Sequence, residues 1–217
     1  MTRPSARRPG EEGGRLPRAS SRRLFLMGAA GAAVTVGGDL GLVEGVWAAA
    51  PHVPDRPFDK EAAEKFMRRA IELSRKGWEA GDGPPFGAVI VKGDKVVGES
   101  WNRRIATKDV TAHAEMEAIR RACKKLDSFS LQGCDLYASA QPCPMCLAAT
   151  YWARIDRVYY GNSARDSAAV GFDDEPFYEQ LKRPPGRRRV PEVQLLAKEA
   201  KEVFEAYAAR QKPARDR

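Results

Sequence analysis

Hydrophobic residues recur at two different spacings along the chain, and the change from one spacing to the other marks the predicted elements. From Phe58 to Gly81 the apolar residues fall near helical spacing, which predicts a first helix. Residues 86–91 form a continuous apolar run, which predicts a buried strand, and residues 96–101 predict a strand that returns from a turn at 92–95. The domain is therefore predicted to begin with a helix and a β-hairpin.

The alternation of helices and strands continues toward the end of the chain. Residues 113–126 place apolar side chains on one face and charged side chains on the other, which predicts an amphipathic helix. Strands alternating with helices predict an α/β sandwich. The remaining predicted elements are strands at 136–139, 158–160 and 193–196 and helices at 143–152 and 198–210.

Composition and charge add limits to this prediction. The chain has 217 residues and 43% hydrophobic residues, which is enough for one core and an appendage. Its formal net charge is +8, but residues 1–48 alone hold seven arginines and four acidic residues. The excess of positive charge in the rest of the chain is modest and indicates a solvated basic face. No run combines aromatic and basic residues as RNA-binding sheets do, so no nucleic-acid partner is expected.

The four cysteines are too few for a disulfide scaffold. Two of them form a Cys-x-x-Cys pair at Cys143 and Cys146. The other two, Cys123 and Cys134, are either buried core thiols or a disulfide pair. The cellular compartment decides between these two alternatives.

Residues 1–48 have the order of regions found in a secretion signal. An arginine-rich start is followed by an apolar run from Leu24 and by small residues before Ala48. The paired Arg22-Arg23 followed by Phe-Leu resembles a twin-arginine signal, which predicts export, for example to the periplasm. Cleavage after Ala48 would leave a proline-rich linker at 49–57 and a functional domain at 58–217.

Two alternatives to a signal are a membrane anchor and a disordered tail of a cytoplasmic protein. An anchoring helix needs about 20 apolar residues. Asp39 and Glu44 interrupt the apolar stretch before it reaches that length. No stable membrane anchor is therefore expected, and a cytoplasmic location remains the alternative to export.

Two short stretches carry the candidate chemistry, Thr111-Ala112-His113-Ala114-Glu115 and Gln141-Pro142-Cys143-Pro144-Met145-Cys146. The His113 imidazole and the Cys143 and Cys146 thiolates are suitable ligands for Zn²⁺. Three protein ligands leave a fourth position for water, as in catalytic zinc sites. Glu115 follows the histidine by two residues and could exchange protons with that water. This H-x-E…P-C-x-x-C arrangement is the signature of zinc deaminases.

Each half of the motif also has a simpler explanation. A Cys-x-x-Cys pair alone could be a redox pair or half of a structural zinc site, and a His-Ala-Glu triplet on a helix is common. Glu115 favours catalysis, because a purely structural zinc site does not need it. We therefore predict a catalytic site, with a non-catalytic zinc-stabilised binding module as the alternative.

Together with the zinc motif, several other segments make the chain resemble a known family. The segment from about Phe58 to Tyr207 resembles the bacterial guanine deaminases of the cytidine-deaminase superfamily. The zinc motif carries the resemblance to the superfamily. Within it, a Gly-Phe-Asp-Asp segment points to guanine as the substrate. The residues that carry the resemblance outside the zinc motif are Gly83-Pro84-Pro85-Phe86-Gly87-Ala88-Val89, Asn102, Tyr151-Trp152-Ala153-Arg154, Ala169-Val170-Gly171-Phe172-Asp173-Asp174 and Phe177-Tyr178.

The resemblance implies a fold, a reaction and a partner. The implied fold is a three-layer α/β/α sandwich around a five-stranded mixed sheet. The implied reaction is zinc-dependent hydrolytic deamination of a purine base, guanine giving xanthine and ammonia, with one Zn²⁺ per chain. The implied assembly is a homodimer whose C-terminal segments are exchanged so that each completes the pocket of the other.

The resemblance also implies roles for four residues outside the zinc motif. Asn102 and Asp174 would recognise the base, and Asp174 would assist proton transfer to the departing amine. Phe86 and Trp152 would line the pocket. Without the resemblance, Asn102 would be a turn residue, Asp174 a loop carboxylate and the two aromatic residues parts of the core.

The chain departs from the family in one respect, and because of this difference other substrates remain alternatives to guanine. Members of the family place a tyrosine at the extreme C-terminus, whereas this chain ends with Arg217 and its last tyrosine is Tyr207. The alternatives are a deaminase of another small base or nucleoside, such as guanosine or cytosine, and a tRNA adenosine deaminase.

Overall fold

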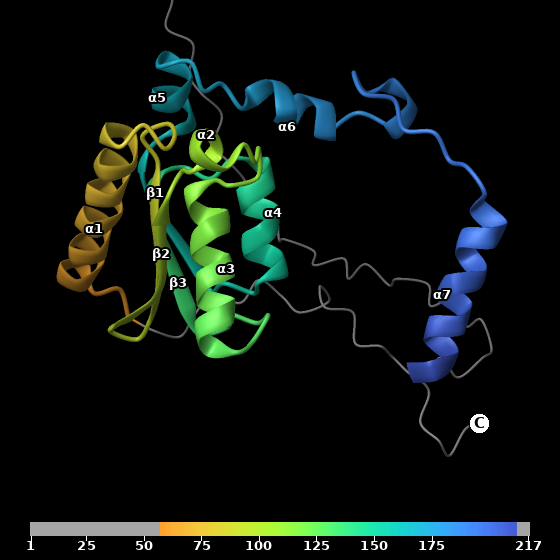
Figure 1. Cartoon of the computed structure of the whole chain (residues 1–217), viewed down its shortest axis with the longest axis horizontal. Helices are drawn as coiled ribbons and strands as arrows, with labels where there is room; N and C mark the ends of the chain where they lie inside the picture. The colour runs from red at the N-terminus through yellow and green to blue at the C-terminus, as the bar shows by residue number, and fades with distance from the viewer. Residues whose placement is uncertain (1–56, 212–217) are drawn as a thin grey trace, which may run out of the picture. The chain divides into compact units, whose positions relative to one another are not determined.

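The structure of the protein is a computed structural model that describes residues 57–211 (Figure 1). The secretion signal predicted at 1–48 and nearly all of the linker predicted at 49–57 lie outside the described residues, so both stay predictions. Among the helices of residues 57–211, none combines the length and the apolar character needed to cross a membrane.

A mixed sheet of four strands forms the centre of the described chain. Its strands lie in the order β2-β1-β3-β4. The pairs β1–β2 and β1–β3 are antiparallel, and the pair β3–β4 is parallel. The strand bounds are β1 Gly87–Lys92, β2 Lys95–Trp101, β3 Cys134–Ala140 and β4 Arg157–Asn162.

Helices cover both faces of this sheet, which gives the three layers predicted from the sequence. Helix α1 (Lys60–Glu79) packs on one face, where Phe66, Ala70 and Leu73 meet Tyr137 of β3. Helices α3 (Ala114–Leu126) and α4 (Pro144–Trp152) cover the other face (Figure 1). The predicted three-layer α/β/α sandwich is therefore confirmed, with a mixed sheet of four strands in place of five.

Strand β1 explains why its sequence is a continuous apolar run. Val89 and Val91 belong to the core beneath α1, whereas Ala88 and Ile90 belong to the core beneath α3. All four side chains are at most 2% exposed. A strand with helices on both faces has no solvent-facing side chains, so the polar alternation of a half-exposed strand is absent.

The segment predicted as a fifth strand, residues 193–196, does not form a strand in the described chain. Val193 is 84% and Leu195 80% exposed. A strand needs a neighbouring strand to bond its backbone groups, and nothing within residues 57–211 provides one for this segment. The remaining helices are α2 Arg104–Thr107, α5 Ala164–Ala169, α6 Glu175–Leu181, the short 3-10 helix η1 Pro185–Arg187 and α7 Ala197–Gln211.

Two basic side chains of α3 bind the backbone of β2, which is an edge strand. Arg121 Nη1 donates to the carbonyl oxygen of Glu99 at 2.8 Å, and Lys125 Nζ donates to that of Val96 at 2.8 Å. An edge strand normally presents such carbonyl groups to other chains. In this protein, two of them already have partners.

Helix α3 lies so close to β2 that a side chain at Gly98 does not fit. A Cβ atom at this position would lie 2.3 Å from the carbonyl oxygen of Ala118 and 2.8 Å from the amide nitrogen of Ala122. We expect Gly98→Ala to lower the free energy of unfolding by about 1–3 kcal/mol, because backbone must move to make room. Urea unfolding measures this loss. Gly186→Ala is the control, since no atom lies within 4 Å of a Cβ there; an equal loss in both variants would contradict the packing argument.

An ion pair joins α1 to β2 and makes stability depend on pH. Arg69 donates to both carboxylate oxygens of Glu99, at 2.8 and 3.0 Å, and this hydrogen bonding lowers the pKa of Glu99. A lowered pKa means that the stabilisation is fully present above the unfolded-state pKa, about 4.3, and is lost as the pH falls through the folded-state pKa.

We therefore expect Glu99→Gln to lower the free energy of unfolding by about 1 kcal/mol or less at pH 7, and by a smaller amount at pH 4 and below. Urea unfolding at both pH values measures the difference. Glu72→Gln serves as the control, because Glu72 meets Arg69 only at 3.6 Å and is 67% exposed. A Glu99→Gln effect that stays constant between the two pH values would rule out the ion pair as its cause.

Candidate functional site

Two helices begin side by side at the proposed zinc site. His113 is the residue that precedes the first turn of α3, and Cys143 precedes the first turn of α4. Cys146 lies in that first turn of α4, which Pro144 starts, a position where proline is favoured. Helix N-termini stabilise negative charge, so this placement favours the thiolate form of Cys143.

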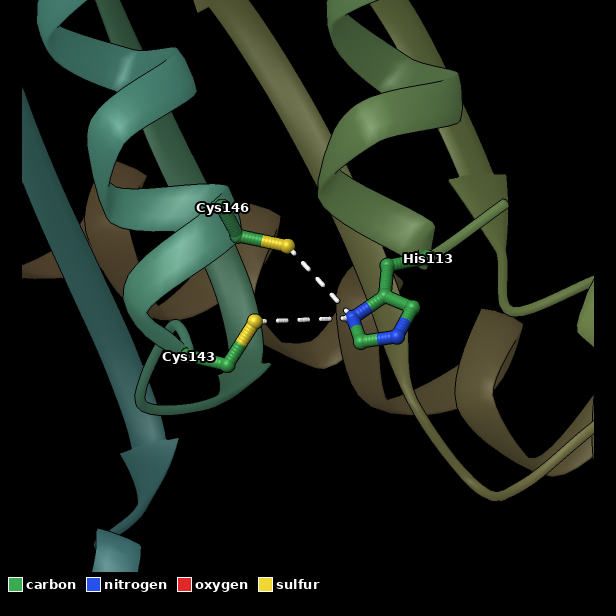
Figure 2. A group of neighbouring side chains, drawn as sticks. All are labelled: His113, Cys143 and Cys146. Atoms are coloured by element: carbon green, nitrogen blue, oxygen red, sulfur yellow. Dashed lines mark hydrogen bonds between the residues drawn. The ribbon is translucent and has the colours of Figure 1, made fainter. Parts of the chain in front are cut away.

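The three side chains converge on one point, as Figure 2 shows. His113 Nδ1 lies 3.6 Å from Cys143 Sγ and 3.5 Å from Cys146 Sγ. The three potential ligand atoms all lie within 4.8 Å of one another. In a tetrahedral zinc site with sulfur at about 2.3 Å and nitrogen at about 2.0 Å from the ion, these atoms lie about 3.5 Å apart. The two nitrogen–sulfur distances therefore fit a zinc ion bound by these residues.

The two thiols strongly affect one another. The hydrogen bond from Cys146 lowers the pKa of Cys143 to about 4. The same contact, together with burial, raises the pKa of Cys146. The pair thus holds one proton between two sulfur atoms, and a divalent cation that binds both thiolates would displace it.

Glu115 lies beside these ligands but is set apart by its burial. It is 7% exposed in the first turn of α3. Burial raises the pKa of its carboxyl group, and contact with Cys143 raises the pKa of His113. A carboxyl group with a raised pKa is a better proton acceptor and can afterwards return the proton, which is what a general acid/base requires.

A cavity of about 320 Å³ opens at this point. It brings together residues that are far apart in the sequence and belong to five different segments. Six of the eight predicted site residues line it, and Cys146 lies behind Cys143, fully buried. The predicted site residues in the lining are Phe86, Asn102, His113, Glu115, Cys143 and Asp174.

Trp152 is the predicted site residue that the structure does not bring to the cavity. It ends α4 and is 74% exposed. In a single chain the helix axis carries Trp152 two turns away from Cys143 and Cys146, so its side chain is outside the lining. A contact between Trp152 and the substrate stays a prediction.

Asn102 is held rigidly in the wall of the cavity. It is 2% exposed, and its Oδ1 accepts a hydrogen bond from the Arg104 amide at 3.1 Å. Gly83 packs against it so closely that a Cβ atom there would lie 2.5 Å from Asn102 Oδ1. With its oxygen engaged, the amide group of Asn102 presents its NH2 as the free donor.

The segment that ends in α6 forms another wall. Asp174 precedes the first turn of α6, and burial raises the pKa of its carboxyl group. Two contacts attach this segment to the metal-binding side. Tyr178 Oη donates to the carbonyl oxygen of Pro142 at 3.3 Å, and Phe172 meets Phe86 edge-on with ring centroids 5.1 Å apart.

Several residues of the lining were not predicted as site residues. Gln141 could have been predicted from the sequence as a site residue, since it immediately precedes Pro142-Cys143 at the end of β3. Ser167 in α5 and Arg104 in α2 gave no signal, because a single serine or arginine in a short helix is common on any surface. The lining residues outside the prediction are Pro84, Arg104, Gln141, Ser167, Gly171, Phe172, Asp173 and Phe177.

Comparisons with known proteins agree with this geometry. Residues 60–162 match the cytidine and deoxycytidylate deaminase zinc-binding region. A guanine deaminase from Bacillus subtilis is 44% identical over 144 residues, which cover 66% of this chain and 92% of the relative. The crystal structure of guanine deaminase from the same species superposes with a TM-score of 0.66 at 43% identity, covering 70% of this chain and 95% of that one.

A second group of relatives modifies tRNA. The tRNA-specific adenosine deaminase of Agrobacterium fabrum is 45% identical over 105 residues, which cover 48% of this chain and 68% of the relative. The similarity to this group is therefore as high in identity as that to guanine deaminase but shorter in extent.

Proposed function

Because the chain belongs to the cytidine and deoxycytidylate deaminase family of zinc-dependent aminohydrolases, we propose that it deaminates guanine to xanthine and ammonia. One observation carries this proposal. A single cavity joins the His113, Cys143 and Glu115 side chains to the buried amide of Asn102 and the carboxyl group of Asp174. The extent of the similarity to guanine deaminase supports a purine base as the substrate.

We propose one zinc ion per chain, held by His113, Cys143 and Cys146. When bound, this ion supplies a water molecule that ionises near neutral pH. Glu115 would accept one proton from the water molecule as the water oxygen bonds to C2 of guanine, and would deliver that proton to N3 of the ring. The remaining hydroxyl proton would pass to the amine, so that the C2–amine bond breaks, ammonia leaves and C2 keeps a carbonyl oxygen. The raised pKa of Glu115 suits both halves of this transfer.

The other residues of the lining hold the base in position. The NH2 group of Asn102 is available as a donor to the base, because its oxygen is bonded to Arg104. Asp174 would assist proton transfer to the departing amine, for which a raised pKa is useful. Phe86, fixed by its contact with Phe172, supplies apolar surface against the flat ring.

Ammonia release from a panel of compounds tests reaction and substrate together. The purified protein would be offered guanine, guanosine, adenine, cytosine and cytidine. We expect guanine to have the highest kcat/KM. A preference for cytosine or cytidine would overturn the substrate assignment, and the absence of ammonia from every compound with zinc bound would overturn the reaction.

The similarity to tRNA-specific adenosine deaminases favours a second candidate, deamination of adenosine in tRNA. The net positive charge would suit phosphate contacts. The shorter extent of this similarity makes it the less favoured reading. Salt-dependent binding of tRNA, with release of inosine-containing product, would support it in place of guanine deamination.

We also propose that the protein is a homodimer with exchanged C-terminal segments. The segment after α6 exposes Val190, Val193 and Leu195, and α7 exposes Phe204 and Tyr207, each at least 65% exposed. Apolar surface of this extent is typical of interfaces. In a dimer, Trp152 and these side chains could be covered by the partner. Light scattering coupled to size exclusion measures the mass, and a monomer at micromolar concentration would overturn this proposal.

For location, we propose export through the twin-arginine route. The support is the order of regions in residues 1–48. Cell fractionation of the full chain and of a variant with Arg22 and Arg23 replaced by lysine tests it. An unchanged cytoplasmic location in both would overturn the proposal.

A further inference from the structure

One side chain of the cavity lining has a polar group that no part of the protein uses. Ser167 lies in α5 and lines the cavity, yet it is only 7% exposed. Within residues 57–211, its hydroxyl group has no hydrogen-bond partner. Among the described residues, the fully buried side-chain atoms without a partner do not include the oxygen of Ser167, so this hydroxyl is open to the cavity and can bond to a ligand there.

The usual partner of a serine hydroxyl in a helix is the carbonyl oxygen four residues earlier. In α5 that oxygen belongs to Ser163, and it accepts the backbone amide of Ser167 at 3.1 Å. The side chain of Ser163 is itself occupied in the capping box with Asp166. The carbonyl oxygen of Ser163 could accept both groups, as that of Arg103 does from Thr107, but the Ser167 hydroxyl does not bond to it and is free to bond elsewhere.

Hydrogen bonds hold the backbone of Ser167 in place. The carbonyl oxygen of Ser167 accepts hydrogen bonds from the amides of Val170 at 3.2 Å and Phe172 at 3.0 Å. Phe172 in turn packs edge-on against Phe86, and both residues line the same cavity. Ser167 is thus anchored between α5 and an aromatic pair that would lie against a flat ring.

The chemistry of guanine indicates which atoms the hydroxyl can meet. The amine to be removed is on C2, so this part of the base must face the metal ligands and Glu115. The opposite edge of guanine carries two acceptors, O6 and N7, whereas adenine has a donating amine in place of O6. A hydroxyl with no acceptor in the protein can donate to either guanine atom.

We propose that Ser167 is a specificity-determining residue whose hydroxyl donates a hydrogen bond to the O6 and N7 edge of the bound purine. This inference rests on the proposed function. It predicts that the hydroxyl favours purines with a carbonyl oxygen at C6 over purines with an amine there. Asn102, whose NH2 faces the same cavity, would be a second donor to the base.

Ser167→Ala removes one atom and places a better helix former in α5, so the fold is retained. For the full-length zinc protein we expect KM for guanine to rise about 3- to 10-fold, with kcat changed less than about 2-fold, as for the loss of one neutral hydrogen bond. Ser74→Ala is the matched control, because the Ser74 hydroxyl bonds within α1 to Ile71. Its KM is expected to equal that of the wild type.

Two guanine analogues show whether the hydroxyl meets the base or only supports the fold. 2-Aminopurine lacks O6 and 7-deazaguanine lacks N7; their KM values, or inhibition constants against guanine, would be measured for wild type and Ser167→Ala. We expect the effect of the substitution to disappear for one of them, which identifies the bonded atom. An equal effect on guanine and both analogues, or no effect on guanine, would overturn the proposal. Failure of the wild type to release ammonia from guanine would instead overturn the proposed function.

Discussion

Replacing Glu115 with glutamine is expected to lower kcat by about 10²- to 10⁴-fold while one zinc ion per chain remains bound. Glutamine has nearly the same shape, but it cannot accept a proton from water or return it to the ring. Glu115 is not one of the three side chains that fit the metal, so its loss leaves His113, Cys143 and Cys146 in place. Ammonia release and metal analysis on the same sample measure both parts of the prediction.

Glu117→Gln is the matched control for this experiment. Glu117 lies on the same first turn of α3, but its carboxylate pairs with Arg120 at 2.6 Å. We expect this variant to keep its kcat within about 2-fold of the wild type, because loss of a surface ion pair costs little. Near-normal activity of Glu115→Gln would remove the glutamate from the proposed mechanism, whatever the behaviour of the control.

The second large effect is expected at Cys146, the most buried of the three metal ligands. Cys146 Sγ is fully buried and lies 3.5 Å from His113 Nδ1. Serine in its place offers a hydroxyl, which is a poor zinc ligand compared with a thiolate. We expect Cys146→Ser to lose bound zinc, to lose measurable deamination, and to unfold at a lower temperature, since bound metal stabilises the folded chain.

Cys123→Ser provides the control for the loss of a thiol. Burial raises the pKa of Cys123, which keeps it a protonated thiol on α3, away from the candidate metal ligands. Metal analysis should find the wild-type zinc content in this variant. If Cys146→Ser also kept one zinc and full activity, the ligand set proposed here would be wrong.

The elements that could be predicted are those whose pattern is local. The turn at 92–95 and the amphipathic helix at 113–126 are confirmed, with ends shifted by one or two residues. The strand predicted at 193–196 depends on a partner strand, which local apolar character does not provide. Helices α5 and α6 were not predicted, because six or seven residues are too few to show a helical period.

The residues of the site likewise divide into those that a local sequence pattern predicts and those that only the fold brings together. The metal ligands and Glu115 were predicted because fixed spacing of rare residue types carries chemical meaning. The structure adds which side chains share their cavity, and this depends on how α5 and α6 return to the ends of α3 and α4. Ser167 contributes through burial and the lack of a partner, which are properties of the fold and leave no mark in the sequence.

The hydrogen bonds from Arg121 and Lys125 to β2 have a consequence for assembly. They occupy two carbonyl oxygens of the β2 edge, so a foreign strand that paired there would have to displace two hydrogen bonds. Addition of a strand at this edge is therefore disfavoured relative to an edge whose carbonyl groups are free.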